Sequence, residues 1–232
     1  MPTNVTRAVL WDMDGVIADT ALEHYRSWQY AFNLRRVNFT EEDFQHCFGQ
    51  RNDAIIRQML GKTVEDSVIE AIARDKEEYF RSHVAEHLKP FPGVIRLLRL
   101  LKEQAILSAI GSSAPLENIE LILKGLHIEE YFQAIVYGQE VTEGKPDPQI
   151  YLLAARKLGA DPRNCIVIED AVAGVQAAKR AGMKCIAVTN THPEPSLREA
   201  DVVTDSLEKI NLKEIEKLLG SASRKINLSQ KI

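Results

Sequence analysis

Two aspartates, Asp12 and Asp14, stand directly after a short apolar run at positions 8–11. In an extended chain, side chains two residues apart point to the same side, so this spacing places two carboxylates in one site. Like charges at that distance raise the pKa of one acid unless a cation lies between them, which calls for Mg²⁺ or for one protonated acid. Gly15 follows and permits a backbone turn that a side chain would obstruct. The structural alternative is an Asx-type turn that leads into a helix.

Further polar residues follow other apolar runs. Glu169 and Asp170 end one run and offer the hard oxygen ligands that Mg²⁺ prefers, while Ser112 and Ser113 follow another. Lys145 precedes a rigid Pro-Asp-Pro segment. Simple alternatives are a helix N-cap for the aspartate or the serines and a solvated surface position for the lysine. Since open α/β sheets bind ligands at the carboxyl ends of their strands, we expect all these residues at one edge.

The elements that must position these residues alternate along most of the chain. Strand patterns occupy residues 8–11, 105–110, 134–137, 165–168, 185–188 and 201–203. Helix patterns occupy residues 94–103, 116–126, 148–158 and 172–181. Alternating strands and helices predict an α/β fold with a doubly wound parallel sheet covered by helices on both faces.

The segment from Thr20 to about Leu88 interrupts this alternation. It has no comparable strand pattern, and its apolar residues recur at helical spacing, with further helix patterns at 41–48, 53–60 and 64–83. We therefore predict an inserted helical cap domain at 20–88, a core domain formed by 1–19 and 89–220, and a tail at 221–232 that frays. No internal repeat is evident.

The composition excludes several classes of protein. Of 232 residues, 45% are apolar and 27% charged, which is typical of a globular chain and not of a disordered or fibrous one. The formal net charge of -4 gives no reason to expect nucleic acid as a partner. No apolar run is long enough to cross a membrane, and the three cysteines form no metal-binding pattern. These features predict a soluble cytoplasmic protein, with no indication of its oligomeric state.

In combination and in this order, the motifs resemble those of the haloacid dehalogenase superfamily. The resemblance runs from Asp12 to about Asp205 and rests on Asp12-Met13-Asp14-Gly15, Ser112, Lys145 and Glu169-Asp170. The helical insert and the stretches at 15–20 and 144–148 resemble the β-phosphoglucomutase-like group, which has a small cap and includes many sugar-phosphate phosphatases.

The resemblance implies a role for each acid. Asp12 would be the nucleophile that attacks phosphorus and forms an aspartyl-phosphate. Asp14 would be the general acid and base, a role that needs a partly protonated carboxyl. The Asp12 carboxylate, the Asp14 backbone carbonyl and Asp170, with Glu169, would hold the Mg²⁺ cofactor.

Ser112 and Lys145 would bind the phosphoryl oxygens, with Gly15 and Ser113 beside the substrate. A phosphate dianion that approaches several carboxylates is repelled, and Mg²⁺ together with the lysine ammonium offsets that charge. Lys145 is therefore essential in this interpretation.

On the cap, His24, Arg51 and Lys76 are candidates for substrate selection, although helical cations are often simply solvated. In the mutases that the chain resembles, matching positions carry an arginine that grips a second phosphate and a histidine–lysine pair that couples cap closure to chemistry. The chain departs from the mutase pattern after Ser112, where Ala114 and Pro115 stand in place of a serine and a lysine.

This departure favours Mg²⁺-dependent hydrolysis of a small phosphorylated metabolite, most readily a sugar phosphate, over a β-phosphoglucomutase-type transfer. A non-catalytic phospho-acceptor switch module is a third alternative, since such modules combine similar residues on a doubly wound sheet. The helical insert and Asp14 argue against a switch, because its chemistry stops at the phospho-aspartate.

Overall fold

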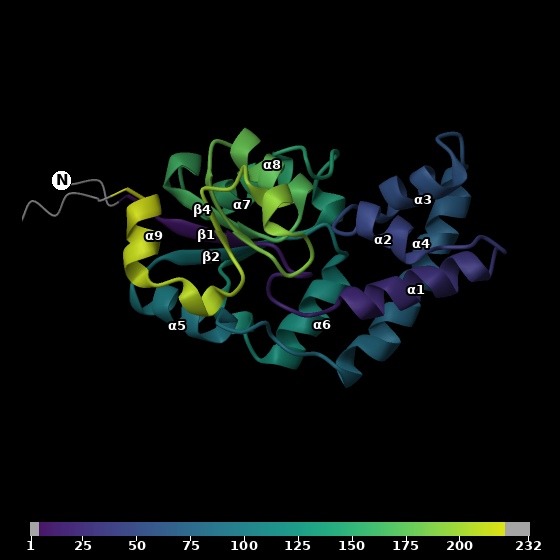
Figure 1. Cartoon of the computed structure of the whole chain (residues 1–232), viewed down its shortest axis with the longest axis horizontal. Coiled ribbons are helices and arrows are strands. Elements are labelled where there is room, and N and C mark those ends of the chain that lie inside the picture. Colours follow the sequence, from purple (N-terminus) through teal and green to yellow (C-terminus); the bar gives the residue numbers. More distant parts are fainter. Residues whose placement is uncertain (1–4, 221–232) are drawn as a thin grey trace, which may run out of the picture.

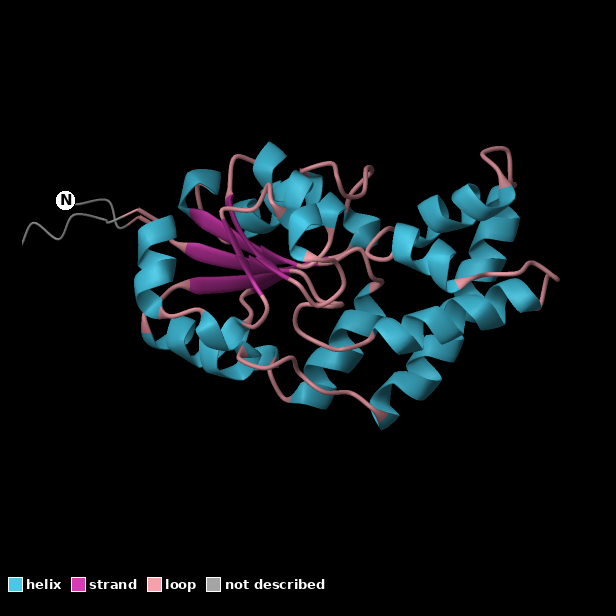
Figure 2. Ribbon diagram, in the orientation of Figure 1, coloured by secondary structure: helices cyan, strands magenta, loops and turns pink. Residues whose placement is uncertain are grey.

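A six-stranded parallel sheet forms the centre of the computed structural model, which describes residues 5–220 (Figure 2). The strands are β1 (Ala8–Trp11), β2 (Leu107–Gly111), β3 (Ala134–Val136), β4 (Cys165–Glu169), β5 (Lys184–Val188) and β6 (Val202–Thr204). Their order in the sheet is β3-β2-β1-β4-β5-β6, which confirms the predicted doubly wound α/β fold. The second strand begins at Leu107 rather than at Ala105, because Ala105 has a φ of 53° and belongs to the preceding turn.

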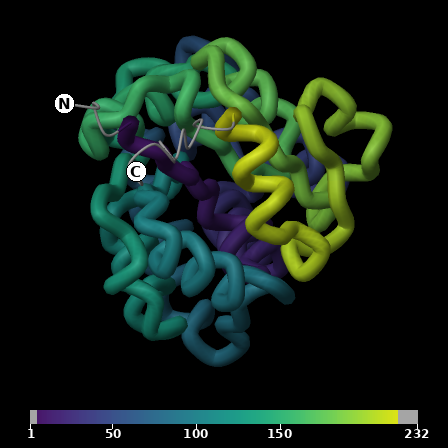
Figure 3. The backbone as a smooth tube through the Cα atoms, turned by 90° about the vertical axis from the view of Figure 1, so that its left-hand side faces the viewer, coloured from purple at the N-terminus to yellow at the C-terminus, as the bar shows by residue number. Residues whose placement is uncertain are grey.

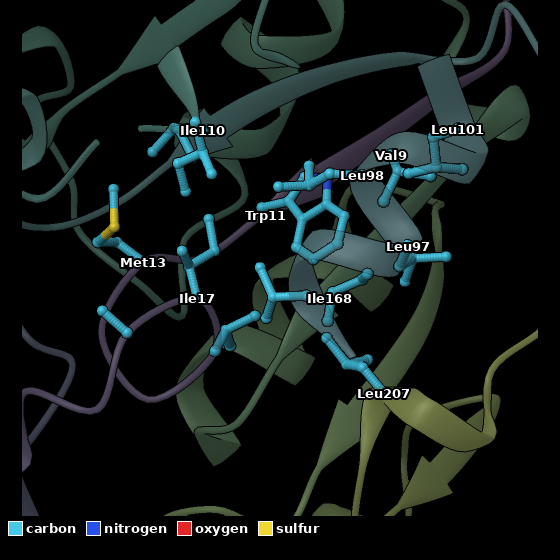
Figure 4. Packing of buried hydrophobic residues seen from close by; sticks show 14 of the residues in the cluster. Val9, Trp11, Met13, Ile17, Leu97, Leu98, Leu101, Ile110, Ile168 and Leu207 are labelled. Atoms are coloured by element: carbon cyan, nitrogen blue, oxygen red, sulfur yellow. The ribbon is translucent and has the colours of Figure 1, made fainter. Parts of the chain in front are cut away.

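Helices cover both faces of the sheet (Figure 1). On one face lie α5 (Val94–Glu103), α6 (Leu116–Leu126) and α9 (Leu212–Leu218), and on the other α7 (Gln149–Lys157) and α8 (Val172–Arg180). The side chains of β1 alternate between the two layers. Val9 and Trp11 pack with Leu97 and Leu98 of α5 (Figure 4), whereas Ala8 and Leu10 pack with α7 and α8. Helix α9 was not among the helices predicted from the sequence.

The remaining helical turns are short. These 3₁₀ helices span Val84–Glu86, Glu129–Tyr131, Gly138–Glu140, Pro162–Asn164, Glu194–Leu197 and Leu207–Lys209. They lie mostly in the connections between strands and helices of the core.

Four helices between β1 and α5 form a separate bundle on one side of the sheet (Figures 1 and 2). They are α1 (Ala21–Asn33), α2 (Glu41–Cys47), α3 (Asn52–Leu60) and α4 (Asp66–His83). Trp28, Phe32, Phe39 and Ile72 belong to their own hydrophobic cluster, separate from the two clusters beside the sheet. This bundle is the predicted helical cap. Not every apolar residue of α1 is buried in it, since Leu22 is 50% exposed.

Strand β1 lies in the middle of the sheet, between β2 and β4 (Figure 3), and this position brings the functional residues together. Trp11 is in register with Ile110 of β2 and with Ile168 of β4. The next residues along these strands therefore emerge at the same edge, and Asp12 continues the ladder by donating its N–H to the carbonyl of Ile168.

Within residues 5–220, no helix is long and apolar enough to cross a membrane. The tail predicted at 221–232 lies outside the described residues.

Candidate active site

Three ionisable groups from separate elements meet at the carboxyl edge of the sheet. Lys145, in the loop before α7, places Nζ 2.7 Å from Oδ1 of Asp12 and 2.6 Å from Oε1 of Glu169. All three side chains are buried, so the lysine is not the solvated surface residue that its loop position allowed. Burial alone would lower the pKa of Lys145, but the charges of Asp12 and Glu169 raise it above its usual value. The lysine therefore stays charged and offsets the acids around it.

Asp12 is the less acidic of the two aspartates after β1. Burial raises its pKa to about 7, while the nearby Lys145 opposes that effect and Glu169 adds to it. The charge of Asp14 contributes less than these groups. The pKa of one aspartate of the pair is thus raised, as the sequence predicted. The main cause is burial rather than repulsion between the two aspartates.

Asp14 points toward the first helix of the cap. Its Oδ1 accepts a hydrogen bond of 2.6 Å from the hydroxyl of Thr20 and lies 3.0 Å from Nε2 of His24. Burial would raise the pKa of Asp14, but the charge of His24, these contacts and the charge of Lys76 lower it overall. In this arrangement Asp14 is a carboxylate, not the partly protonated acid that its expected role requires.

Glu169 has little capacity left for a further ligand. Its Oε1 accepts from Lys145 and from the hydroxyl of Tyr151, at 2.6 Å each. Its Oε2 accepts from the backbone N–H groups of Asp170 and Ala171, at 2.9 and 3.1 Å. Lys145 and these hydrogen bonds offset the effect of burial and hold the pKa of Glu169 below its usual value. Glu169 therefore serves first as an anchor for its neighbours.

Asp170 has a free oxygen at the same place. Its Oδ2 accepts from the hydroxyl of Thr191, whereas its Oδ1 is buried without a hydrogen-bond partner. Carboxylate oxygens of Asp12, Glu169 and Asp170 lie within 4.8 Å of one another. A buried, unpartnered carboxylate oxygen within such a cluster fits Mg²⁺, which takes hard oxygen ligands.

The serines and the aspartate at the strand ends are not helix N-caps, which was the alternative interpretation of these residues. No side chain caps α6, which follows Ser112 and Ser113, or α8, which follows Asp170. Ser112 instead accepts a hydrogen bond from the N–H of Ala114, and the buried hydroxyl of Ser113 has no partner. Both serines line a cavity between the sheet edge and the cap, which we call the central cavity; Asp12, Asp14, His24 and Lys76 line it as well.

Gly15 packs behind the acids and does not line this cavity. Its φ is 81°, and a Cβ there would come 2.0 Å from Oδ2 of Asp170. The glycine thus permits close packing of the turn against the acidic cluster.

The cap supplies the opposite wall of the cavity. Nζ of Lys76 lies 3.0 Å from Nδ1 of His24 and 2.8 Å from Oε1 of Glu77, and all three residues are buried and line the cavity. The ring of His24 stacks on Phe80 with the centroids 4.1 Å apart, which fixes its direction. The space left is small, at about 40 Å³.

Arg51 does not line this cavity. Its guanidinium forms an ion pair with Asp53, with Nε 3.0 Å from Oδ1, and donates to the carbonyls of Val141 and Thr142 at 2.7 and 3.1 Å. The structure therefore brings His24 and Lys76 to the site but directs Arg51 toward a core loop.

Several residues that matter at the site were not singled out from the sequence as separate candidates. They are Thr20, Tyr151 and Thr191, which bond the acids, and Glu77, Asn52 and Asn118, which meet at the cap wall. Thr20 lies within a stretch that carried the family resemblance. The other five belong to no motif in the sequence.

The comparisons with known proteins agree with this geometry. Residues 9–188 match the family described as haloacid dehalogenase-like hydrolase. A phosphorylated carbohydrates phosphatase of Thermotoga maritima is 34% identical, over 77% of this chain and 83% of that protein. A beta-phosphoglucomutase of Bacillus subtilis is 32% identical, over 89% and 92%.

A solved structure and a longer relative extend the comparison. The crystal structure of a beta-phosphoglucomutase from Clostridium difficile superposes with a TM-score of 0.84 at 26% identity, covering 93% of this chain and 97% of that one. The protein SUPPRESSOR OF QUENCHING 1 of Arabidopsis thaliana is 33% identical over 90% of this chain, which spans 20% of that protein's length.

Proposed function

This chain belongs to the haloacid dehalogenase-like hydrolase family, and we propose that it is a Mg²⁺-dependent phosphatase of small phosphorylated metabolites, most readily sugar phosphates. Its relatives include phosphatases and phosphoglucomutases, so it is an enzyme of that kind. The observation that carries the choice of hydrolysis is the direction of Arg51, whose guanidinium is bound to Asp53 and to a core loop outside the cavity.

Asp12 is the proposed nucleophile. One carboxylate oxygen attacks phosphorus, the bond to the leaving oxygen breaks, and the phosphoryl group becomes an aspartyl-phosphate. Lys145, 2.7 Å from Oδ1 of Asp12, offsets the negative charge of the incoming phosphate. The hydroxyls of Ser112 and Ser113 line the same cavity and are placed to donate to phosphoryl oxygens.

Asp14 is the proposed acid and base. As a carboxylate it takes a proton from the water that hydrolyses the intermediate, and the same proton is then available for the leaving oxygen in the next cycle. The contacts with Thr20 and His24 hold its side chain at the cavity, on the side that faces the cap. The proton-transfer group and the nucleophile thus face the substrate from neighbouring positions of one turn.

Asp12 and Asp170, with the Asp14 backbone carbonyl as implied by the family, are the residues that would hold Mg²⁺. When bound, the ion supplies positive charge that stabilises the phosphoryl group during transfer. Glu169 supports this set by holding Lys145 and the backbone after β4.

The second candidate function is phosphosugar mutase, which the Bacillus subtilis and Clostridium difficile relatives favour. A mutase must hold a second phosphate and keep water away from the aspartyl-phosphate. Neither Arg51 nor the side chains of Ala114 and Pro115 donate hydrogen bonds in this cavity, which favours hydrolysis.

The test is a panel of phosphorylated metabolites, assayed for phosphate release with Mg²⁺ and again after EDTA treatment. We expect many turnovers per chain with Mg²⁺ and none after chelation. Release of about one phosphate per chain would identify a switch module instead, and undiminished turnover in EDTA would rule out the metal assignment.

A second assay separates hydrolase from mutase. β-Glucose 1-phosphate is supplied with a trace of the 1,6-bisphosphate, and glucose 6-phosphate and free phosphate are followed together. Rapid isomerisation with little phosphate release would contradict the choice of hydrolysis.

A further inference from the structure

The cap wall carries a buried carboxylate that the proposed chemistry does not use. Glu77, on α4, is 5% exposed and lines the central cavity. Its Oε1 accepts hydrogen bonds of 2.8 Å from both Lys76 and Asn52, and its Oε2 accepts one of 2.5 Å from Asn118 on α6. Because the donors come from two cap helices and one core helix, the carboxylate has a fixed position where cap and core meet.

The charge of Glu77 offsets the charge of Lys76 at this wall. Burial would raise its pKa, but the charges of Lys76 and His24 and the hydrogen bonds lower it, so the group is ionised at neutral pH. Lys76 is therefore half of a buried ion pair with Glu77 rather than a free cation. Arg51, as described above, is directed elsewhere.

Beside this ion pair, the wall also carries neutral polar groups. The amides of Asn52 and Gln50 line the cavity beside Glu77. A hydroxyl can donate to a carboxylate and exchange hydrogen bonds with amides. A second phosphate at the same place would lose its water beside a fixed negative charge, which is unfavourable.

We propose that Glu77 is a specificity-determining residue, which rejects substrates with a second phosphate and selects leaving groups that present hydroxyls to the cap. This inference rests on the proposed function, because it assumes that the reacting phosphate lies at Asp12 and Lys145. In this proposal, the carboxylate of Glu77 is the cap group that discriminates against bisphosphates.

The experiment compares two matched competitors, propane-1,3-diol monophosphate and propane-1,3-diol bisphosphate. Each is tested as a competitive inhibitor of the monoester that the panel identifies as a substrate, with the wild type, Glu77→Gln and Glu78→Gln. Glu78 is the exposed neighbour on the same helix and serves as the matched control. The result measured is the ratio of the two inhibition constants.

We expect the wild type and Glu78→Gln to bind the monophosphate in preference to the bisphosphate. Glu77→Gln should shift the ratio toward the bisphosphate by at least about tenfold, since one negative charge is removed within a few ångströms of the second phosphate. A ratio that is the same in Glu77→Gln and in the wild type would overturn the proposal.

Glu77→Gln also removes the partner of a buried lysine, which can prevent folding. Asn52→Lys avoids this, because it adds a second cation beside Oε1 of Glu77 and leaves the Lys76 pair intact. It should shift the ratio in the same direction, whereas Glu77→Asp, which keeps the charge, should retain the preference for the monophosphate. An unchanged ratio in a folded Asn52→Lys protein would also overturn the proposal.

Failure of the proposed function is a separate outcome. If the panel yields no substrate, calorimetric titration of the same two competitors into the Mg²⁺-loaded protein still gives the ratio. Tighter binding of the bisphosphate by the wild type would overturn the role of Glu77, whereas an empty substrate panel would overturn only the proposed phosphatase function.

Discussion

The edge of the sheet and the cap wall face each other across one cavity, but they hold their charged groups in different ways. At the sheet edge, Asp12, Lys145 and Glu169 come from three separate elements of the core and form two short ion pairs. At the cap wall, Lys76 and Glu77 are neighbours on one helix and pair with each other. The charged groups at the sheet edge are held together by contacts within the core. Those of the cap wall also depend on contacts between cap and core, such as the hydrogen bond from Asn118 to Glu77.

The two aspartates after β1 belong to these two regions. The charges that act most strongly on Asp12 are those of Lys145 and Glu169, both from the core, after the effect of burial. The strongest on Asp14, again after burial, is that of His24, with Lys76 also contributing, both from the cap. The comparison indicates that core residues set the pKa of Asp12, the proposed nucleophile, while cap residues set that of Asp14, the proposed acid and base.

The largest effect is expected from Asp12→Asn. The amide cannot act as the nucleophile, so phosphate release should fall by at least about a thousandfold. The side chain lies at the carboxyl end of a strand, and the fold should remain intact by circular dichroism. Asp205→Asn, at an exposed ion pair with Lys209, is the matched control and should leave turnover unchanged. Wild-type turnover in Asp12→Asn would require another nucleophile.

A cap variant at His24 should change the pKa of Asp14 and leave Asp12 unaffected. In His24→Asn the side chain whose charge and hydrogen bond lower the pKa of Asp14 is lost, so that pKa should rise and the acidic limb of the pH profile should move to higher pH. We expect kcat/KM to fall by about 10- to 100-fold at neutral pH, with Mg²⁺ affinity unchanged. His46→Asn, on the exposed side of α2, is the control. A loss of Mg²⁺ affinity in His24→Asn would contradict the view that cap residues act on Asp14 and not on the metal site.

The pH dependence of Mg²⁺ binding tests the core region by itself. The pKa of Asp12 is raised to about 7 in the absence of metal, so below that pH the ion must displace a proton. Burial also raises the pKa of Asp170, the other carboxylate proposed to hold the ion. Apparent Mg²⁺ affinity should therefore fall by about tenfold or more per pH unit below pH 7. Titration calorimetry between pH 5.5 and 8 measures this, and an affinity independent of pH would contradict the account of Asp12.

The smallest effect is expected from Arg51→Ala. The guanidinium joins the cap to the carbonyls of Val141 and Thr142, outside the cavity. Hydrolysis should change by less than about threefold, and the free energy of unfolding should fall by about 1 kcal/mol. A loss above about tenfold in kcat/KM would show that Arg51 contacts the substrate.

Most of the core site could be predicted from the sequence because its residues stand directly after predicted strands. The predicted helices and strands agree with the observed ones to within two residues at each end. Asp12, Ser112 and Glu169 lie at neighbouring strand ends, as the alternation of strands and helices implied. The helix α9 was missed although Asn211 and Glu214 form a capping box at its start, because seven residues are too few for a clear apolar period.

The sequence by itself determined which acids and which lysine share one edge, since parallel strands bring their carboxyl ends together whatever lies on the rest of the molecule. Only the tertiary structure decided the direction of Arg51, the ionisation of Asp14 and the position of Glu77. Each of these depends on a partner from another element: Glu77 meets Asn52 and Asn118, which are 25 and 41 positions away in the sequence. Helical periodicity gives the face of a helix, but the charge that a buried side chain carries is set by the groups packed against it.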